Sequence, residues 1–195
     1  MDLKSFLLEK RTSVLERWLG DVLSSYPSQT AEFIRNRKNQ FANPVGSIIS
    51  EGISGIFDGL LAGLEADAQP DAGVMADFLE DIIKVRAIQD FSASQALGFI
   101  FSLKKAVRDE VGALGEGGEG LHKELGRLDG SIDRLALAAF DVYSQCRERI
   151  YELKANEVRN QTYRILQQAN LICGTNPAET GKGGGNGDSP EKKIG

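Results

Sequence analysis

The amino-acid sequence predicts an all-α fold, a bundle of about six helices with a long C-terminal helix. Apolar residues recur at three- and four-residue steps along most of the chain, which is the spacing of one helix face. Residues that favour helix starts precede several of these runs, and proline- or glycine-rich stretches separate them. The 195 residues, 41% of them hydrophobic, are enough to build one substantial core.

Two helices are predicted before residue 42. The apolar stripe of the first consists of Leu3, Leu7, Val14, Trp18 and Val22. It predicts a helix from about residue 2 to residue 25, which Pro27 closes. Ser28 suits the N-cap of a second, shorter helix. That helix carries three cations, Arg35, Arg37 and Lys38. We expect them to lie on a solvated face, and an anion-binding or partner-binding site is the alternative.

The third predicted helix spans residues 44–64 and carries glycines along one face. Asn43 and Pro44 fit an N-cap followed by a first-turn proline. The glycines of this face are Gly52, Gly55, Gly59 and Gly63. Each interior glycine costs about 0.5–1 kcal/mol relative to alanine, so some feature of the fold must offset all four. Either a neighbouring helix packs closely against the strip, or a ligand lies on it.

Two further helices flank a break at residues 90–92. Ser92 and Gln95 fit a capping box, so a core-facing helix should restart directly after the break. The helix before the break carries Arg86 and Gln89 at the edge of its apolar face. Such polar groups need partners if they are buried.

The last predicted helix starts near Ser131 and continues for about forty residues. Residues 115–120, a glycine-dense turn, and the polar segment 121–130 are predicted to form a flexible connection before it. The first apolar seam of the helix consists of Ile132, Ala136, Ala139, Tyr143, Cys146, Ile150 and Leu153.

Beyond this seam the apolar positions move by one residue, about 100° around the helix. The second seam consists of Tyr151, Ala155, Val158, Thr162, Ile165, Ala169 and Ile172. We interpret the shift as a helix that first packs on its own domain and then offers another face to a partner. A slightly irregular core helix is the alternative.

The predicted helical domain covers residues 1–173, and residues 174–195 form a glycine-rich tail. The tail has almost no apolar side chains, so it cannot offset the entropy cost of ordering. We therefore expect the tail to be disordered.

Composition argues against several classes of function. The net charge of -5 and the pI near 5.1 disfavour general binding to nucleic acid. We find no apolar run of the eighteen or so residues that a membrane span needs, and no signal-peptide pattern, so we expect a cytoplasmic protein that is not embedded in a membrane. Cys146 and Cys173 lack metal-binding spacing and are expected to be reduced, with a Cys173 link across a parallel dimer as an alternative.

No catalytic residue and no metal site are predicted. His122 is the single histidine, which excludes a His-rich metal site, and it is expected to be an exposed residue beside the glycine turn. A glycine-rich surround is a poor wall for haem, so we expect no cofactor. Carboxylate pairs such as Asp77 with Glu80 lie on a predicted solvated face. Enzymatic activity is therefore not expected.

Two blocks of sequence resemble those of a known family. They are VRAIQDFSASQALGFIFSLKKAVRDE, residues 85–110, and NQFANPVGSIISEGISGIFDGLL, residues 39–61. Together with the opening LLEKRTSVLERW, they resemble the RsbT co-antagonist protein RsbRD N-terminal domain family over about residues 5–155. The resemblance implies an N-terminal sensory module of stress-signalling regulators or of histidine kinases, with a globin-like helical dimer that holds no haem. Neither a phosphorylatable output domain nor a kinase region follows here, so the implied role is a stand-alone sensory or scaffolding module.

Two functions of different class follow as predictions. The first is a non-catalytic regulatory module of signal transduction that acts by protein–protein binding, as a homodimer through the C-terminal helix and with an unknown protein partner. The second is a small-molecule or cofactor-binding protein with a pocket between helices 44–64 and 93–114. The candidate pocket residues are Gly52, Gly55, Arg86, Gln89 and Phe99.

Overall fold

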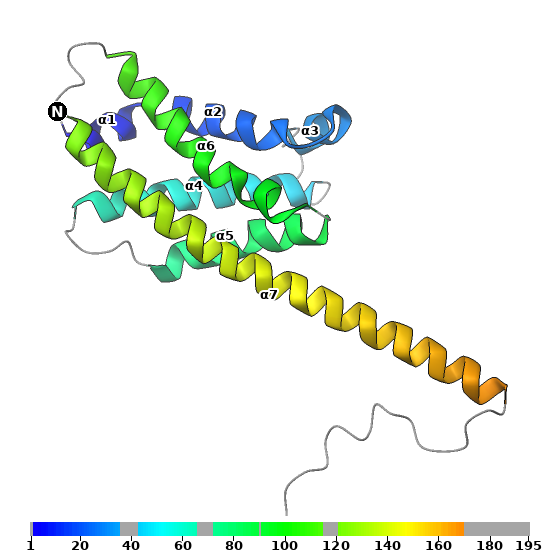
Figure 1. Cartoon of the computed structure of the whole chain (residues 1–195). Helices are drawn as coiled ribbons and strands as arrows, with labels where there is room; N and C mark the ends of the chain where they lie inside the picture. Colours follow the sequence, from blue (N-terminus) through cyan, green and yellow to red (C-terminus); the bar gives the residue numbers. More distant parts are fainter. Residues whose placement is uncertain (1, 36–42, 66–71, 90, 115–120, 170–195) are drawn as a thin grey trace, which may run out of the picture. The chain divides into compact units, whose positions relative to one another are not determined.

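The structure is a computed structural model, and it describes residues 2–35, 43–65, 72–89, 91–114 and 121–169 (Figure 1). The described residues form helices and no strand, which confirms the predicted all-α fold. The helices are α1 (Leu3–Glu9), α2 (Arg11–Ser24), α3 (Ser28–Arg35), α4 (Pro44–Glu65), α5 (Ala72–Ile88), α6 (Ala93–Gly112) and α7 (His122–Gln168). The chain divides into two compact units, Met1–Ile150 and Tyr151–Gly195, and α7 passes from the first into the second.

The single helix predicted over residues 2–25 is in fact two helices, α1 and α2. The chain turns at Lys10, whose φ of -91° and ψ of 9° depart from helical values. The turn lets both α1 and α2 contact α4. Asp2 caps α1, because its Oδ1 accepts a hydrogen bond of 2.7 Å from the backbone N–H of Ser5. This split is the reason why the described residues form seven helices where the sequence predicts about six.

The core of the first unit draws apolar side chains from every helix in it, and Trp18 is the largest of those that are fully buried. Its ring stacks on that of Phe99, with the centres 6.2 Å apart. Trp18 Nε1 donates a hydrogen bond of 2.7 Å to the carbonyl oxygen of Phe99. The indole N–H is therefore satisfied in the core, and it ties α2 to α6.

Residues of α5 cover Gly52, Gly55 and Gly59 of the α4 strip, which confirms the close-packing interpretation for these three glycines. A Cβ atom added to Gly55 would lie 2.3 Å from the Phe78 ring, and one added to Gly59 would lie 2.4 Å from the Met75 side chain. A Cβ at Gly52 would lie 2.5 Å from Ile82. The missing side chains therefore allow α5 to approach α4 closely, and the two helices run side by side (Figure 1).

Among the described residues, α4 is the one helix long and apolar enough to cross a membrane by length and composition. Its Pro44–Leu64 segment has 21 residues and a mean hydropathy of 1.3, so the expectation that no such run exists is wrong. Its buried apolar residues are Ile49, Ile53, Ile56, Phe57, Leu60 and Leu61. In the structure these side chains lie in the core of the first unit.

The break before α6 has the predicted capping box. The Ser92 side chain accepts from the backbone N–H of Gln95, and the Gln95 side chain accepts from the backbone N–H of Ser92 at 3.0 Å. Glu110 of α6 is a charged residue within the core, where it is only 8% exposed. It accepts a hydrogen bond of 2.6 Å from Ser13 Oγ and pairs with Arg17 at 2.9 Å. These partners from α2 make its burial possible.

Helix α7 begins at His122 and not near Ser131, so the segment 121–130 predicted as a flexible connection is largely helical. Buried residues extend the first apolar seam from Ile132 toward the N-terminal end of α7. They are Leu121, Leu125 and Leu128, which with Ile132 are spaced at steps of four, three and four. Glu124 also accepts a hydrogen bond of 2.7 Å from the backbone N–H of Leu3. The turn predicted at 115–120 and the tail predicted at 174–195 lie outside the described residues.

The predicted first seam of α7 is buried as far as Tyr143, and Cys146 and Ile150 are half-buried. Leu153, predicted as the last member of this seam, is 63% exposed. The first seam therefore ends with the first unit, at Ile150.

Candidate functional site

The most unusual side chain of the first unit is Arg86, near the end of α5. It is 1% exposed, although arginine is almost never fully buried unless it is paired. Arg86 follows Ile82 by four residues and Ile83 by three, and both isoleucines are fully buried. The helical repeat therefore directs Arg86 into the core together with them.

Three aromatic rings surround the Arg86 guanidinium, and we call them the aromatic cage. The guanidinium carbon lies 4.7 Å from the ring centre of Phe91, 5.2 Å from that of Tyr26 and 5.4 Å from that of Phe99. Tyr26 and Phe91 also contact each other edge to face, with the ring centres 5.1 Å apart. The negative face of an aromatic ring attracts a cation, so the cage offsets part of the cost of burying the charge.

Hydrogen bonds satisfy only part of the guanidinium. Its Nη2 donates to Ser25 Oγ at 2.5 Å and to the carbonyl oxygen of Gln95 at 3.3 Å. Among the described residues, its Nε and Nη1 have no acceptor, and the buried hydroxyl of Tyr26 has no partner either. Arg86 takes part in none of the ion pairs found among the described residues.

The electrostatics follow from this burial. Desolvation lowers the pKa of the Arg86 guanidinium, while the nearby Tyr26 oxygen acts in the opposite direction. Desolvation also raises the pKa of the Tyr26 hydroxyl, and the charge of Arg86 opposes that change. Both shifts have burial as their main cause.

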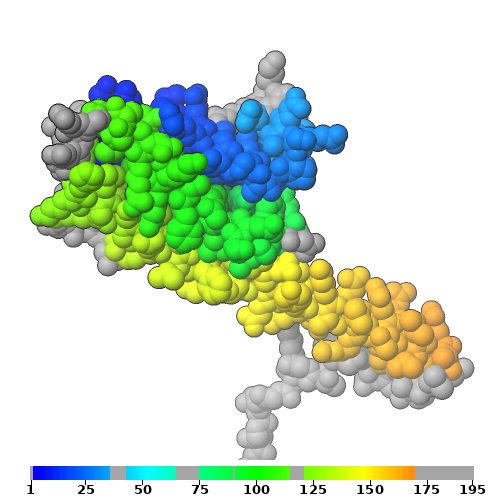
Figure 2. Space-filling model, turned by 45° about the horizontal axis from the view of Figure 1, so that its top comes forward, coloured from blue at the N-terminus to red at the C-terminus, as the bar shows by residue number. Residues whose placement is uncertain are grey.

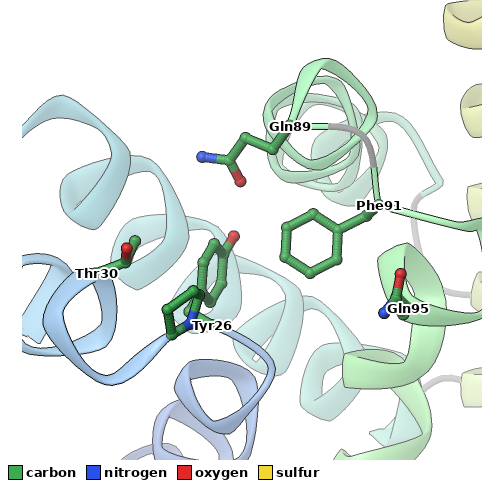
Figure 3. A pocket seen from close by; sticks show the side chains of 6 residues that line it. Tyr26, Thr30, Gln89, Phe91 and Gln95 are labelled. Carbon is green, nitrogen blue, oxygen red and sulfur yellow. The ribbon is translucent and has the colours of Figure 1, made fainter.

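A pocket of about 380 Å³, which we call the Arg86 pocket, adjoins the aromatic cage (Figure 3). It is lined by Tyr26, Pro27, Thr30, Gln89, Phe91 and Gln95. These residues come from the α2–α3 junction on one side and from the α5–α6 junction on the other. Figure 3 shows the Tyr26 hydroxyl, the Gln89 carboxamide and Thr30 around a common space beside the Phe91 ring. The Tyr26 and Phe91 rings belong to both the cage and the pocket.

The structure brings together three of the five residues that the sequence analysis assigned to a ligand pocket. Arg86 and Phe99 belong to one cluster, and Gln89 lines the adjoining pocket. Gly52 and Gly55 face α5 side chains instead, because Ile82 and Phe78 cover them. The Arg86 pocket therefore lies elsewhere than between helices 44–64 and 93–114.

Sequence reasoning missed the residues that make the cage and most of the pocket. Tyr26 directly precedes Pro27, which the sequence analysis treats only as a helix stop, and Phe91 lies in the segment 90–92 that it treats only as a helix break. An aromatic residue at such a break was the available signal, because polar residues usually fill turns. Tyr143 holds this break in place, since its hydroxyl donates a hydrogen bond of 2.6 Å to the Phe91 carbonyl oxygen.

An apolar groove of about 470 Å³ lies between α6 and the first part of α7. It is lined by Ala93, Ser94, Leu97, Phe101, Asp133, Ala136, Leu137 and Phe140. Leu137 is 70% exposed, and Phe101 and Phe140 are about half exposed. Figure 2 shows α6, in green, beside the yellow-green start of α7, and Lys104 of α6 pairs with Asp133 of α7 at 2.7 Å.

In the second unit, α7 exposes its side chains without interruption from residue 151 to residue 162. Tyr151, Val158 and Ile165 are 58%, 61% and 64% exposed. They are seven residues apart and belong to the predicted second seam, whose last member, Ile172, lies outside the described residues.

The remaining candidate groups form no reactive cluster. His122 is exposed at the start of α7, and the described residues contain no group of histidine, cysteine, aspartate and glutamate suited to hold a metal ion. Cys146 is a free thiol whose pKa is raised by burial. Cys173, Arg37 and Lys38 lie outside the described residues, and Arg35 is exposed.

Comparison with known proteins identifies the family. The model of the RsbT co-antagonist protein rsbRD N-terminal domain matches residues 12–158, close to the predicted extent. Comparisons with curated proteins and with solved structures gave no significant match. The family match covers well over half of the sequence and includes both blocks on which the resemblance rests. The chain therefore belongs to the RsbT co-antagonist protein rsbRD N-terminal domain family.

Proposed function

We propose that this protein is a regulatory signalling module that acts by binding proteins, beginning with a second copy of itself, and not by catalysis. Its family suggests a regulatory role in a partner-switching system. The proposal adds how the module acts: α7 of two chains pairs through residues 151–169. We also propose that the protein acts in the cytoplasm, which accords with its acidic composition.

The exposed apolar stripe at the end of α7 is the observation that carries the proposal. Most helical stability in proteins comes from packing of an apolar face, so this exposed end of α7 would gain stability from a partner. Tyr151, Val158 and Ile165 recur every seven residues, and Ala155 and Thr162 lie between them at four-residue steps. This repeat is typical of two helices that pair in parallel.

The composition of the stripe favours reversible pairing. Alanine and threonine alternate with the larger side chains, so the seam buries only a modest apolar area. A two-fold pair would bring each seam residue against its own copy, which makes one stripe sufficient for both chains. The apolar groove between α6 and α7 offers a separate surface for a different protein.

Sedimentation velocity of three proteins tests the pairing. The parent should be a dimer at micromolar concentration, and Val158→Glu with Ile165→Glu should be monomeric, because four like charges would face one another across the seam. The matched control is Asn160→Glu with Gln167→Glu, two exposed positions that each follow a seam residue by two and so lie on the opposite face. This control adds the same charge and should remain dimeric.

Two results would reject the proposed pairing. One is a parent that sediments as a monomer at micromolar concentration, and the other is a seam variant as dimeric as the parent. Circular dichroism should show that all three proteins retain the helical first unit, since none of the changes touches its core.

A further inference from the structure

The charge of Arg86 is unbalanced within the part of the chain that the structure describes. The guanidinium is 1% exposed, is surrounded by neutral groups, and forms no ion pair with a described carboxylate. A buried charge without a partner destabilises a fold, and an apolar residue of similar volume would pack there at lower cost. Packing alone therefore does not explain an arginine at this position.

The aromatic cage cannot replace a missing anion. Ring faces attract the cation as a whole, but the Nε–H and Nη1–H groups still lack an acceptor. The Tyr26 hydroxyl, which shares the cage, lacks a partner as well. Unsatisfied donors of Arg86 and Tyr26 therefore occur in one cluster. The Arg86 donors carry positive charge, and the Tyr26 ring lies beside that charge.

The Arg86 pocket adjoins the aromatic cage, and the two have the Tyr26 and Phe91 rings in common. Tyr26 and Phe91 contact the guanidinium and also line the pocket, and the backbone of Gln95 accepts a hydrogen bond from Arg86 while Gln95 lines the pocket too. A volume of about 380 Å³ is at the small end of the range for ligand sites. Phe91 and Pro27 supply apolar walls, and Thr30 and Gln89 supply polar groups at the rim.

From this arrangement we propose that the Arg86 pocket binds a small organic carboxylate with a flat apolar body. The carboxylate balances the charge of Arg86 and accepts a hydrogen bond from the Tyr26 hydroxyl, and the apolar body lies against Phe91. The polar side chains of Thr30 and Gln89 complete the site at its open side. The inference goes beyond the proposed function, because every residue of the site belongs to the first unit and none to the pairing stripe.

Three probes separate the charge of the ligand from its shape. Benzoate carries both the carboxylate and a flat ring, benzamide keeps the ring without the charge, and inorganic phosphate keeps negative charge without the ring. By calorimetric titration, benzoate should bind the parent at least about tenfold more tightly than benzamide, because charge-assisted hydrogen bonds are the stronger ones. The nuclear magnetic resonance signal of the Arg86 Nε–H should shift on addition of benzoate and not of benzamide.

Variants assign the effect to named residues. Arg86→Met should remove the preference for benzoate over benzamide. If this core change prevents folding, Thr30→Val with Gln89→Ala provides an independent test, since Gln89 is exposed and Thr30 is only half-buried. The double change should weaken benzoate binding without altering the melting temperature. Gln29→Ala, an exposed change one residue before Thr30 and outside the pocket lining, should leave binding unchanged.

The proposal is overturned if benzoate does not bind, if it binds no better than benzamide, or if phosphate binds and benzoate does not. It is also overturned if a folded Arg86→Met binds benzoate as tightly as the parent. The same titration on Val158→Glu with Ile165→Glu should give unchanged affinity, so a failure of the pocket and a failure of the α7 pairing appear in different experiments.

Discussion

Tyr26 and Tyr143 are both buried, but their hydroxyl groups differ in hydrogen bonding. Each side chain is 8% exposed. The Tyr143 hydroxyl donates to the Phe91 carbonyl oxygen at 2.6 Å, whereas the Tyr26 hydroxyl finds no partner in the part of the chain that the structure describes. A satisfied buried hydroxyl contributes to stability, and an unsatisfied one costs free energy.

Removing each hydroxyl therefore has a different expected effect. Tyr143→Phe should lower the free energy of unfolding by about 0.5–1.5 kcal/mol, because it breaks a partly buried hydrogen bond. Tyr26→Phe should leave it within about 0.5 kcal/mol of the parent or raise it slightly. Urea denaturation of the two variants makes the comparison. Equal losses would mean that the Tyr26 hydroxyl has a partner, such as an ordered water.

The glycines of α4 and α6 form a second contrasting pair. Gly55→Ala should destabilise the protein by about 1–3 kcal/mol, because the new Cβ would lie 2.3 Å from the Phe78 ring. Gly98→Ala should instead stabilise it by about 0.5–1 kcal/mol, since nothing lies within 4 Å and alanine favours a helix interior. Thermal denaturation measures both. If Gly55→Ala melts like Gly98→Ala, α5 does not pack on the glycine strip.

The sequence identifies some of the residues near Arg86, but it does not predict which of them contact one another. Arg86 and Gln89 stand out as polar residues at an apolar edge, and the structure places both at or beside the Arg86 pocket. Tyr26 and Phe91 lie 65 residues apart in the chain, and no local pattern relates them. Such pairings depend on how helices dock, which periodicity within one helix does not determine.

Asn43 connects two helices in addition to capping one. Its Oδ1 accepts a hydrogen bond of 2.9 Å from the Gly46 N–H at the start of α4. Its Nδ2 donates to the carbonyl oxygens of Phe33 and Ile34 in α3, at 2.8 and 3.0 Å. The sequence predicts the cap but not the link to α3, because only the cap has a fixed spacing in sequence.

Two substitutions separate the roles of Asn43. Asn43→Ala should lower the free energy of unfolding by roughly 1–3 kcal/mol, since it removes the cap and leaves buried carbonyls without donors. Asn43→Asp keeps the capping oxygen but turns a carboxylate towards two carbonyl oxygens, so a loss of similar size is expected. Urea denaturation decides, and an Asp variant as stable as the parent would show that only the cap contributes.

Helix boundaries are where the sequence-based prediction was weakest. Gly126 and Gly130 disfavour a helix locally, which led to the wrong start for α7. The structure shows that Leu121, Leu125 and Leu128 enter the core, and this burial outweighs the propensity of the glycines. The split of α1 from α2 at Lys10 was missed for a related reason, because no proline or glycine marks the turn.

The two units differ in whether their apolar side chains are covered within a single copy of the chain. Residues 1–150 bury a continuous apolar core, and the sequence predicts most of it from periodicity. Residues 151–169 expose a regular apolar stripe instead. The change of seam near residue 150 is visible in the sequence, whereas the identity of the proposed partner of the second seam is not. The globin-like dimer implied by the resemblance stays a prediction.

Disulfide cross-linking between α7 helices tests the pairing most directly. In a background of Cys146→Ala and Cys173→Ala, single cysteines replace two seam residues, Tyr151→Cys and Ile165→Cys. Their controls, Leu153→Cys and Gln167→Cys, each lie two residues farther along and so on the opposite face. The measurement is the rate at which each variant forms a covalent dimer under mild oxidation.

A parallel pair in register brings each seam cysteine close to its own copy, within the few ångströms that a disulfide spans. Both seam variants should therefore cross-link rapidly and both controls slowly. If the controls cross-link as fast as the seam variants, or if neither seam variant cross-links, residues 151–169 do not form the interface between two copies of this protein.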